Sequence, residues 1–328
     1  METEMKVEGL KVLVTGGAGF IGSHLADKLL ERHNIVVAYD NFSPYYSGKE
    51  RNVRNNVDNP NYHLVKADIL DFGALSQAMK DVDVVFHLAA QPGVRYSIEH
   101  ALEVSQINVS GTVNVLEAAR QKRVRKVVYA SSSSVYGNPK CMPVGEEHPL
   151  DPISPYGVSK LAAEKYCQVY RRLYEMDIVI LRYFTVYGPR QRPDMAIHRF
   201  VDQIFESKAP VVYGDGKQTR DFTYIDDIVV GTIKAAEIEG YAGEAFNLGG
   251  GHRVSVNDLL KRLIKLCRKE NVVKPIYEHA KLGDVTDTHA DISKARRILG
   301  FEPKTDVEGG LRNFIEWHKL SLRTRKEK

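Results

Sequence analysis

The sequence predicts an α/β fold, in which a doubly wound parallel Rossmann sheet is followed by a smaller C-terminal α/β lobe. Short runs of β-branched and aromatic residues alternate with amphipathic stretches through the first half of the chain. A glycine-rich segment directly follows the first of these runs. Beyond residue 187 the alternation loosens, and glycine-containing turns become frequent. We therefore expect a Rossmann domain over residues 1–187 and a second lobe mainly over residues 188–328, with the chain crossing between them.

The expected strands are apolar enough to be buried on both faces of a parallel sheet. They occupy residues 10–15, 35–39, 62–66, 82–88, 124–130 and 178–181. Amphipathic segments that predict helices lie between them, at residues 21–31, 75–79, 104–121 and 154–175. Since strands and helices alternate, we expect helices on both faces of the sheet.

Composition excludes several classes of protein. The net charge of the 328 residues is only +4, and the single dense basic run, residues 323–328, is interpreted as a solvated tail rather than a nucleic-acid patch. The three cysteines form no CxxC pair and have no histidine at metal-ligand spacing, so neither a disulfide nor a metal site is expected. No apolar run reaches the roughly 18 residues that span a bilayer. We expect a cytoplasmic protein without membrane or nucleic-acid partners.

Residues 15–22 read TGGAGFIG and predict a dinucleotide site. The motif follows an expected strand and opens an expected helix, which is the context that a bare glycine motif lacks. Glycines let the backbone approach a pyrophosphate closely, and the helix N-terminus offers unpaired N–H groups. A glycine-rich turn without a ligand is the alternative.

Asp40 indicates which dinucleotide is bound. It stands at the end of the second strand, about 20 residues past the glycines, where a carboxylate accepts hydrogen bonds from a ribose 2′-hydroxyl and repels a 2′-phosphate. NAD is therefore favoured over NADP, unless Asp40 is only a strand-end cap. Other candidate cofactor contacts open the first helix or follow expected strands. They are Gly16, Gly19, Phe20, Ile21, Gly22, Asn41, Asp68, Ile69, Leu88, Ala89 and Ala90. Tyr156 and Lys160, in a later expected helix, are also candidate cofactor contacts.

Tyr156 and Lys160 are the candidate catalytic pair. Their i,i+4 spacing places both side chains on one face of the helix expected at residues 154–175. A lysine ammonium and a positive nicotinamide would lower the pKa of the phenol from about 10 toward neutrality, so that it can act as a base. Two surface residues of a helix are the alternative, but the dinucleotide motif favours a site.

Together these motifs resemble those of the extended short-chain dehydrogenase/reductase family, whose members include the NAD-dependent nucleotide-sugar epimerases. The resemblance also rests on ASSSSVYG at residues 130–137 and on SPY at 154–156, and it covers nearly the whole chain. It implies a Ser/Tyr/Lys triad made of Ser132, Tyr156 and Lys160. It also implies a homodimer built from the helices at residues 104–121 and 154–175. Asn108 matches a further family position near the active site, or is only a satisfied helix residue.

The second lobe carries segments that resemble the UDP-sugar-binding parts of this family. GDGKQTRDFTY at residues 214–224 places Arg220 where it would reach a diphosphate, to which its fork of donors is suited. Asp284 matches the position that binds the uridine ribose. Lys281 stands where many glucose epimerases carry arginine, so the second phosphate anchor is open.

The sugar is indicated by the segment after the strand at 178–181. Thr185 replaces an asparagine found in most glucose and N-acetylhexosamine epimerases, and with RPDMA at 192–196 and QPGVRYS at 91–97 it resembles the UDP-glucuronate 4-epimerases. Hydroxyls of Ser133, Ser134 and Thr185 could hold the C6 carboxylate. Arg95 and Arg192 are the next candidates, and Thr185 could instead only pack at a strand end.

Three other functions remain open. A UDP-glucose or UDP-N-acetylglucosamine 4-epimerase would differ in the sugar pocket alone. UDP-glucuronate decarboxylases carry a glutamate directly before VYG, where this chain has Ser134, so the acid-free run at residues 131–134 argues against a lyase. An NAD-sensing module of the same fold would need no catalytic triad, since fold does not fix function.

Overall fold

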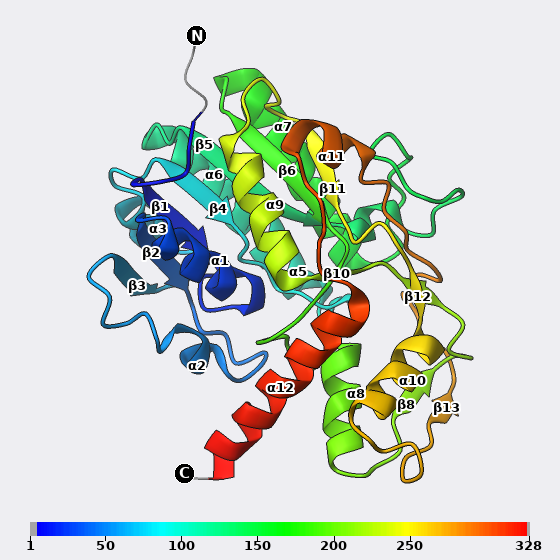
Figure 1. Ribbon diagram of the computed structural model, residues 1–328. Helices are drawn as coiled ribbons and strands as arrows, with labels where there is room; N and C mark the ends of the chain where they lie inside the picture. Colours follow the sequence, from blue (N-terminus) through cyan, green and yellow to red (C-terminus); the bar gives the residue numbers. More distant parts are fainter. Residues whose placement is uncertain (1–4, 327–328) are drawn as a thin grey trace.

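The computed structural model describes residues 5–326, and its centre is a seven-stranded parallel sheet (Figure 1). The strand order is β11-β6-β5-β4-β1-β2-β3. The order of the strands reverses between β1 and β4, and ligands of doubly wound sheets bind beyond the carboxyl ends of the strands at such a point. The strands are β1 (Lys11–Thr15), β2 (Ile35–Asp40), β3 (Tyr62–Lys66), β4 (Val84–His87), β5 (Lys126–Ser132), β6 (Ile178–Tyr183) and β11 (Ala245–Leu248).

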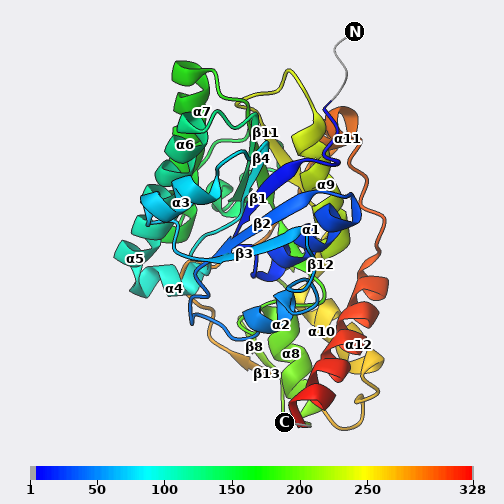
Figure 2. The same cartoon turned by 90° about the vertical axis from the view of Figure 1, so that its left-hand side faces the viewer.

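Helices cover both faces of this sheet, as Figure 2 shows in an edge-on view. One face carries a layer with α3, α6 and α7, and the other face carries α1 and α9, which pack against each other. The helices of the first part of the chain are α1 (Phe20–Glu31), α2 (Lys49–Val53), α3 (Phe72–Ala78), α4 (Val94–Glu99), α5 (Ala101–Ser105), α6 (Gly111–Gln121) and α7 (Pro155–Tyr174). The predicted doubly wound fold is confirmed.

Two details of the sequence prediction are wrong. The helix expected at residues 104–121 is interrupted by a π-helical segment, Gln106–Ser110 (η1), which connects α5 to α6. The strand expected to be buried on both faces at residues 62–66 is β3, which lies at the edge of the sheet and exposes His63, Leu64 and Lys66. An edge strand has a neighbour on one side only, so its apolar sequence does not require full burial.

The second part of the chain contributes one strand and one helix to the large domain and also forms the smaller lobe. Strand β11 pairs with β6, and α9 packs on β5 and β6. The elements after β6 are β7 (Thr185–Tyr187), α8 (Ala196–Phe205), β8 (Val211–Tyr213), β9 (Thr219–Arg220), β10 (Phe222–Tyr224), α9 (Ile225–Glu237), β12 (Val254–Ser255), α10 (Val256–Leu266), β13 (Ile276–Glu278), α11 (Ser293–Leu299) and α12 (Val307–Lys326). In both views α8, α10, β8 and β13 gather at one end of the molecule.

Three small strand pairs build the rest of this lobe. Strand β10 pairs with β7 and β13 with β8 in parallel, whereas β12 pairs with β9 in the antiparallel sense. Among residues 5–326, no helix combines the length and the apolar character that a membrane span requires. The side chains of the basic run at 323–328 lie outside the described residues.

Candidate active site

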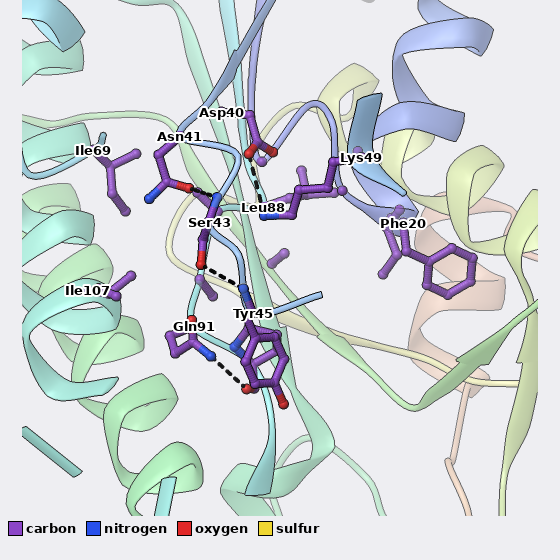
Figure 3. A pocket seen from close by; sticks show the side chains of 18 of the residues that line it. Phe20, Asp40, Asn41, Ser43, Tyr45, Lys49, Ile69, Leu88, Gln91 and Ile107 are labelled. Atoms are coloured by element: carbon purple, nitrogen blue, oxygen red, sulfur yellow. Dashed lines mark hydrogen bonds and ion pairs between the residues drawn. The ribbon is translucent and has the colours of Figure 1, made fainter. Parts of the chain in front are cut away.

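The main pocket lies beyond the carboxyl ends of β1, β2, β4 and β5 (Figure 3). Every residue that the sequence analysis proposed as a cofactor contact lines it. These residues are Gly16, Gly19, Phe20, Ile21, Gly22, Asp40, Asn41, Asp68, Ile69, Leu88, Ala89, Ala90, Tyr156 and Lys160. The side chains therefore meet at the point where the strand order reverses, as the sheet topology requires.

The glycine turn between β1 and α1 leaves no room for side chains. Gly16 has a positive φ of 71°. A Cβ on Gly22 would lie only 2.1 Å from the Gly16 carbonyl oxygen. The helix can start this close to the strand only because both positions are glycine, and its first N–H groups then face the pocket. These features fit the pyrophosphate of a dinucleotide.

Asp40 is the last residue of β2 and is held by two hydrogen bonds and one ion pair. Its carboxylate accepts hydrogen bonds from the Ala18 N–H at 3.1 Å and from the Phe42 N–H at 2.8 Å. The Lys49 ammonium lies 3.6 Å from it and points toward it in Figure 3. Lys49 partly balances the Asp40 charge at this end of the pocket, a contribution that the sequence analysis did not foresee.

Tyr156 stands at the start of α7, whose N-terminus is firmly fixed. The Ser154 hydroxyl accepts the Gly157 N–H at 3.1 Å, and Pro155 occupies the first helical turn. The Tyr156 N–H donates to the Ser97 hydroxyl on α4 at 3.0 Å. One turn later, the buried Lys160 ammonium donates to the Ala130 carbonyl at 2.7 Å.

The electrostatics of this pair differ from the expectation. Burial raises the pKa of Tyr156, and the groups that oppose this are the Arg192 charge and the Ser132 hydroxyl rather than Lys160. Burial lowers the pKa of Lys160 to about 8, although Glu164 acts in the opposite direction. A lowered pKa of Tyr156 therefore does not follow from the protein groups alone and requires a further positive charge beside the phenol.

The serine run ends β5 and lies against the start of α7. Ser132 ends β5, and its hydroxyl accepts the Ser134 N–H at 3.1 Å at the start of a 3₁₀ turn, Ser133–Tyr136 (η2). The Ser132 and Ser134 hydroxyls are also 3.1 Å apart. A Cβ on Gly157 would lie 2.6 Å from the Ser134 carbonyl oxygen, so only glycine lets α7 approach this turn so closely. The run is an ordered turn beside Tyr156, not a flexible linker.

Thr185 and Arg192 belong to the segment that follows β6. Thr185 begins β7, two residues after Tyr183, which pairs with Ser132 across the sheet. Its backbone N–H donates to the Asp221 carbonyl. Arg192 lines the main pocket and is held by Asp194 through two hydrogen bonds of 2.9 and 3.0 Å.

The remaining substrate-side residues form a separate cluster with aromatic and charged members. Arg95 forms an ion pair with Asp284, with 2.6 Å between Nη2 and Oδ2, and its guanidinium lies over the Tyr213 ring. Lys281 lies over the same ring. Arg220 donates to backbone carbonyls of Thr219, Val285 and Thr286 at 2.7–2.9 Å. The cluster thus joins α4 to the segment before α11.

Comparison with known proteins assigns the family. The model of the GDP-mannose 4,6 dehydratase family matches residues 13–314, which is nearly the whole chain. The chain belongs to this family, a branch of the extended short-chain dehydrogenases/reductases. The predicted family resemblance is confirmed.

Individual relatives are similar over their full length. The chain is 41% identical to an uncharacterized UDP-glucose epimerase of Bacillus subtilis over 94% of this chain and 98% of the relative. It is 40% identical to the UDP-glucuronate 4-epimerase of Thermodesulfobacterium geofontis, over 94% and 96% respectively. A crystal structure of the Bacillus cereus UDP-glucuronic acid 4-epimerase with UDP-glucuronic acid and NAD has a TM-score of 0.91, at 41% identity over 95% of this chain and all of that chain.

Sequence analysis missed part of this family pocket. The additional lining residues include Ser43, Tyr45 and Tyr46 of the loop after β2 and Lys49 at the start of α2. No regular pattern in the sequence places this loop over the pocket, because its position depends on tertiary contacts such as that of the Tyr45 hydroxyl with Asp194 at 3.2 Å.

Asn108 has a positioning role in the structure. It is buried in the π-helical segment η1, where its side chain bonds the Gln91 N–H at 2.7 Å and the Gln91 carbonyl at 3.1 Å. Its amide also donates to the Ser159 hydroxyl at 2.9 Å. Gln91 in turn lines the pocket. Of the two interpretations left open, these contacts favour a satisfied residue that holds the pocket wall.

Proposed function

We propose that this chain is a UDP-glucuronate 4-epimerase that interconverts UDP-glucuronate and UDP-galacturonate through a 4-keto intermediate with tightly bound NAD. The observation that carries the proposal is the acid-free serine turn beside Tyr156 and Lys160. Two of the relatives named above, the UDP-glucuronate 4-epimerases of Thermodesulfobacterium geofontis and Bacillus cereus, match nearly the whole chain and support it. NAD, when bound, would supply the acceptor and donor of the C4 hydride.

The cofactor would be held by the residues that line the main pocket. The glycine turn would take the pyrophosphate at the N-terminus of α1, because a side chain at Gly22 would collide with the backbone there. Asp40 would accept hydrogen bonds from the adenosine ribose, and Asn41, Asp68 and Ile69 would surround the adenine. Lys160 would bond the other ribose from within the pocket that it lines.

The chain's own groups would then move the substrate proton. Tyr156 would accept the proton of the sugar O4 as the hydride leaves C4, and Ser132, whose hydroxyl acts to lower the pKa of the phenol, would orient the sugar hydroxyl. The ring of the keto sugar must turn over before the hydride returns to the opposite face. The site therefore has to hold the UDP moiety firmly and the sugar loosely.

The C6 carboxylate distinguishes this reaction from related ones. Oxidation at C4 produces a β-keto acid, which loses carbon dioxide when the C5–C6 bond aligns with the ketone. Ser133, Ser134 and Thr185 would hold the carboxylate out of that alignment by hydrogen bonds. No acidic residue occurs in the turn that would repel the carboxylate or favour a lyase reaction.

The UDP moiety would bind at the cluster around Tyr213. Asp284 would contact the uridine ribose, and Arg220 would reach the diphosphate. Arg220 now donates to three backbone carbonyls, so binding would exchange some of these acceptors for phosphate oxygens. In the same way, Arg95 would exchange its ion pair with Asp284 for a contact with the ligand.

A homodimer in the cytoplasm completes the proposal. Helix α7 exposes apolar side chains along one face, among them Val158, Tyr166, Val169 and Leu173, and nearby Leu102 on α5 is 90% exposed. Such a face is typical of an interface between copies of a chain. Cys141, Cys167 and Cys267 are unpaired thiols, which agrees with a reducing compartment.

Product analysis tests the function directly. The purified protein is incubated with UDP-glucuronate, UDP-glucose and UDP-N-acetylglucosamine in turn, and the products are separated. We expect conversion of UDP-glucuronate to UDP-galacturonate without UDP-4-keto-pentose. Preferred turnover of UDP-glucose would favour the rival that the Bacillus subtilis relative represents, and binding of NAD without any turnover would favour a sensing module.

A further inference from the structure

A buried ion pair lies beside β5, the strand that ends at Ser132, and has no part in the mechanism described so far. Glu164 on α7 and Arg182 on β6 form two hydrogen bonds of 2.8 and 3.0 Å, and their side chains are 1% and 4% exposed. The Ser131 hydroxyl donates to the same carboxylate at 2.5 Å. Ser131 and Arg182 are paired across β5 and β6, so both side chains reach Glu164 from one face of the sheet.

The arrangement connects one helix face to three successive strand residues. Tyr156, Lys160 and Glu164 repeat every four residues along α7. The last residues of β5 face these side chains: the Ser132 hydroxyl acts to lower the pKa of Tyr156, the Ala130 carbonyl accepts from Lys160, and the Ser131 hydroxyl donates to Glu164. The hydrogen bond from Ser131 to Glu164 therefore fixes α7 to the end of β5, and the ion pair extends this link to β6.

Arg182 extends the same network to the serine turn. Its Nη1 donates to the Tyr136 hydroxyl at 2.8 Å and to the Glu146 carbonyl at 3.0 Å. The Tyr136 hydroxyl donates in turn to Asn247 on β11 at 2.7 Å. Because Tyr136 ends the 3₁₀ turn that begins at Ser133, Arg182 holds both ends of the segment 131–136, through Glu164 and Ser131 at one end and Tyr136 at the other.

We propose that Glu164 and Arg182 are positioning residues, which fix the end of β5 against α7 and so set the distance between Ser132 and Tyr156 at which the substrate proton is transferred. The inference rests on the proposed function for the roles of those two residues. Stability alone is a weak reason for such a pair, since desolvating two charges costs about as much as their attraction returns. Precise geometry is a better reason, since misplacement by about 1 Å can cost a hundredfold in rate.

Glu164 also affects the charge of its neighbour on the helix. The groups that face the Lys160 ammonium are Tyr129 on β5, His87 on β4, and Glu164 and Cys167 on α7. His87 is buried with its pKa lowered to about 3, so it is neutral. Glu164 acts to raise the pKa of Lys160 and thus helps to keep it protonated.

Ser131→Ala is the sharpest variant, because it removes the link to the strand and leaves Glu164 and Arg182 paired. We expect kcat to fall about tenfold or more, with the KM for the UDP-sugar changed less than about twofold. Ser131→Thr keeps the hydroxyl and should restore most of kcat. If the Ser131 hydroxyl only stabilised the fold, both variants would keep the wild-type kcat at a temperature well below the unfolding transition.

Glu164→Gln adds a second readout that does not depend on folding efficiency. Loss of the carboxylate lowers the pKa of Lys160, so the basic limb of the kcat–pH profile should move to lower pH. Asp177→Asn is the matched control, since it removes the partner of the buried Lys126 at the opposite end of β5. It should lower the unfolding temperature and leave the profile unchanged.

The results with these variants test the positioning role independently of the proposed substrate. The proposal is wrong if Ser131→Ala and Glu164→Gln keep the wild-type kcat and pH profile and lose only thermal stability, as the control does. That result would show that the ion pair is purely structural. If the wild type epimerises UDP-glucose instead, the proposed substrate is wrong, but the ratio of variant to wild-type kcat still decides the positioning role. A wild type that epimerises no UDP-sugar overturns both.

Discussion

Lys160 carries a charge in a place that water hardly reaches. The side chain is buried, its hydrogen bond to Ala130 is internal, and burial lowers its pKa from 10.5 to about 8. A lysine whose pKa is lower in the folded state destabilises the fold wherever it is protonated in both states, that is, below about pH 8. Above that value the unfolded chain binds the extra proton, so this penalty fades as the pH approaches 10.5.

Lys160→Met should therefore stabilise the protein while it removes activity. A shift from 10.5 to about 8 corresponds to about 3 kcal/mol, and loss of the donor to Ala130 returns about 1 kcal/mol. We expect the free energy of unfolding at pH 7 to rise by about 2 kcal/mol, and the gain to shrink between pH 8 and pH 10. Denaturant unfolding at matched NAD content measures this, and a variant less stable than wild type at pH 7 would mean that the buried charge is well compensated.

A substitution at Thr185 tests whether a single hydroxyl group sets the preference for UDP-glucuronate. Thr185→Val keeps the shape of the side chain, whereas a lost hydrogen bond to a carboxylate should cost about 1.5 to 3 kcal/mol. We expect the preference for UDP-glucuronate over UDP-glucose to fall about tenfold or more, and some 4-keto-pentose to be released as the carboxylate rotates. Products are resolved by chromatography, with wild type run in parallel. Unchanged preference and no added carbon dioxide would mean that Thr185 only packs.

At the scale of elements, the glycine turn depends on how closely α1 approaches β1. Gly22→Ala would place a methyl group 2.1 Å from the Gly16 carbonyl oxygen, so the turn must open. We expect a loss of more than about 2 kcal/mol in stability and of NAD binding, measured by unfolding and by cofactor content after purification.

Gly73→Ala is the matched control for this substitution. Gly73 lies in α3, and a Cβ there meets only the Asp71 carboxylate at an ordinary 3.4 Å. Alanine should stabilise this helix by about 0.5 to 1 kcal/mol and leave NAD content unchanged. Retention of normal NAD content by Gly22→Ala would contradict the assignment of the turn to the pyrophosphate.

The elements also show how far the sequence could be interpreted. The strands around the pocket and the positions of Gly16, Asp40, Tyr156 and Lys160 follow from local patterns, because strand, turn and helix succeed one another within each unit. The π-helical break at Asn108 and the coverage of the pocket by Tyr45 do not. Both depend on contacts with segments far away in the sequence, Ser159 and Asp194 respectively.

The electrostatics were least predictable for the same reason. The sequence placed Lys160 beside Tyr156 but could not show that its ammonium donates to Ala130, or that Arg192 and Ser132 are the groups acting on the phenol. The ion pair of Glu164 and Arg182 joins a helix to a strand 18 positions away. No spacing rule marks such a pair before the sheet is assembled.

At the scale of the whole molecule, the exposed face of α7 predicts assembly. Leu173→Glu places a charge among the apolar residues of that face, where Leu173 is 66% exposed. We expect wild type to sediment as a dimer at micromolar concentration and the variant to shift toward monomer. Val230→Glu on α9, on the opposite side of the sheet, is the control and should leave the dimer intact. A monomeric wild type would remove the claim.

The fate of one hydrogen atom tests the central claim that a hydride leaves C4 and returns to the same carbon within a closed site. UDP-glucuronate with deuterium at C4 is converted in ordinary water, and the isotope content of the UDP-galacturonate is measured by mass spectrometry. We expect full retention of deuterium at C4, because Tyr156 exchanges only the O4 proton while the hydride stays in the pocket. Loss of the deuterium to solvent, or the absence of UDP-galacturonate, would contradict it.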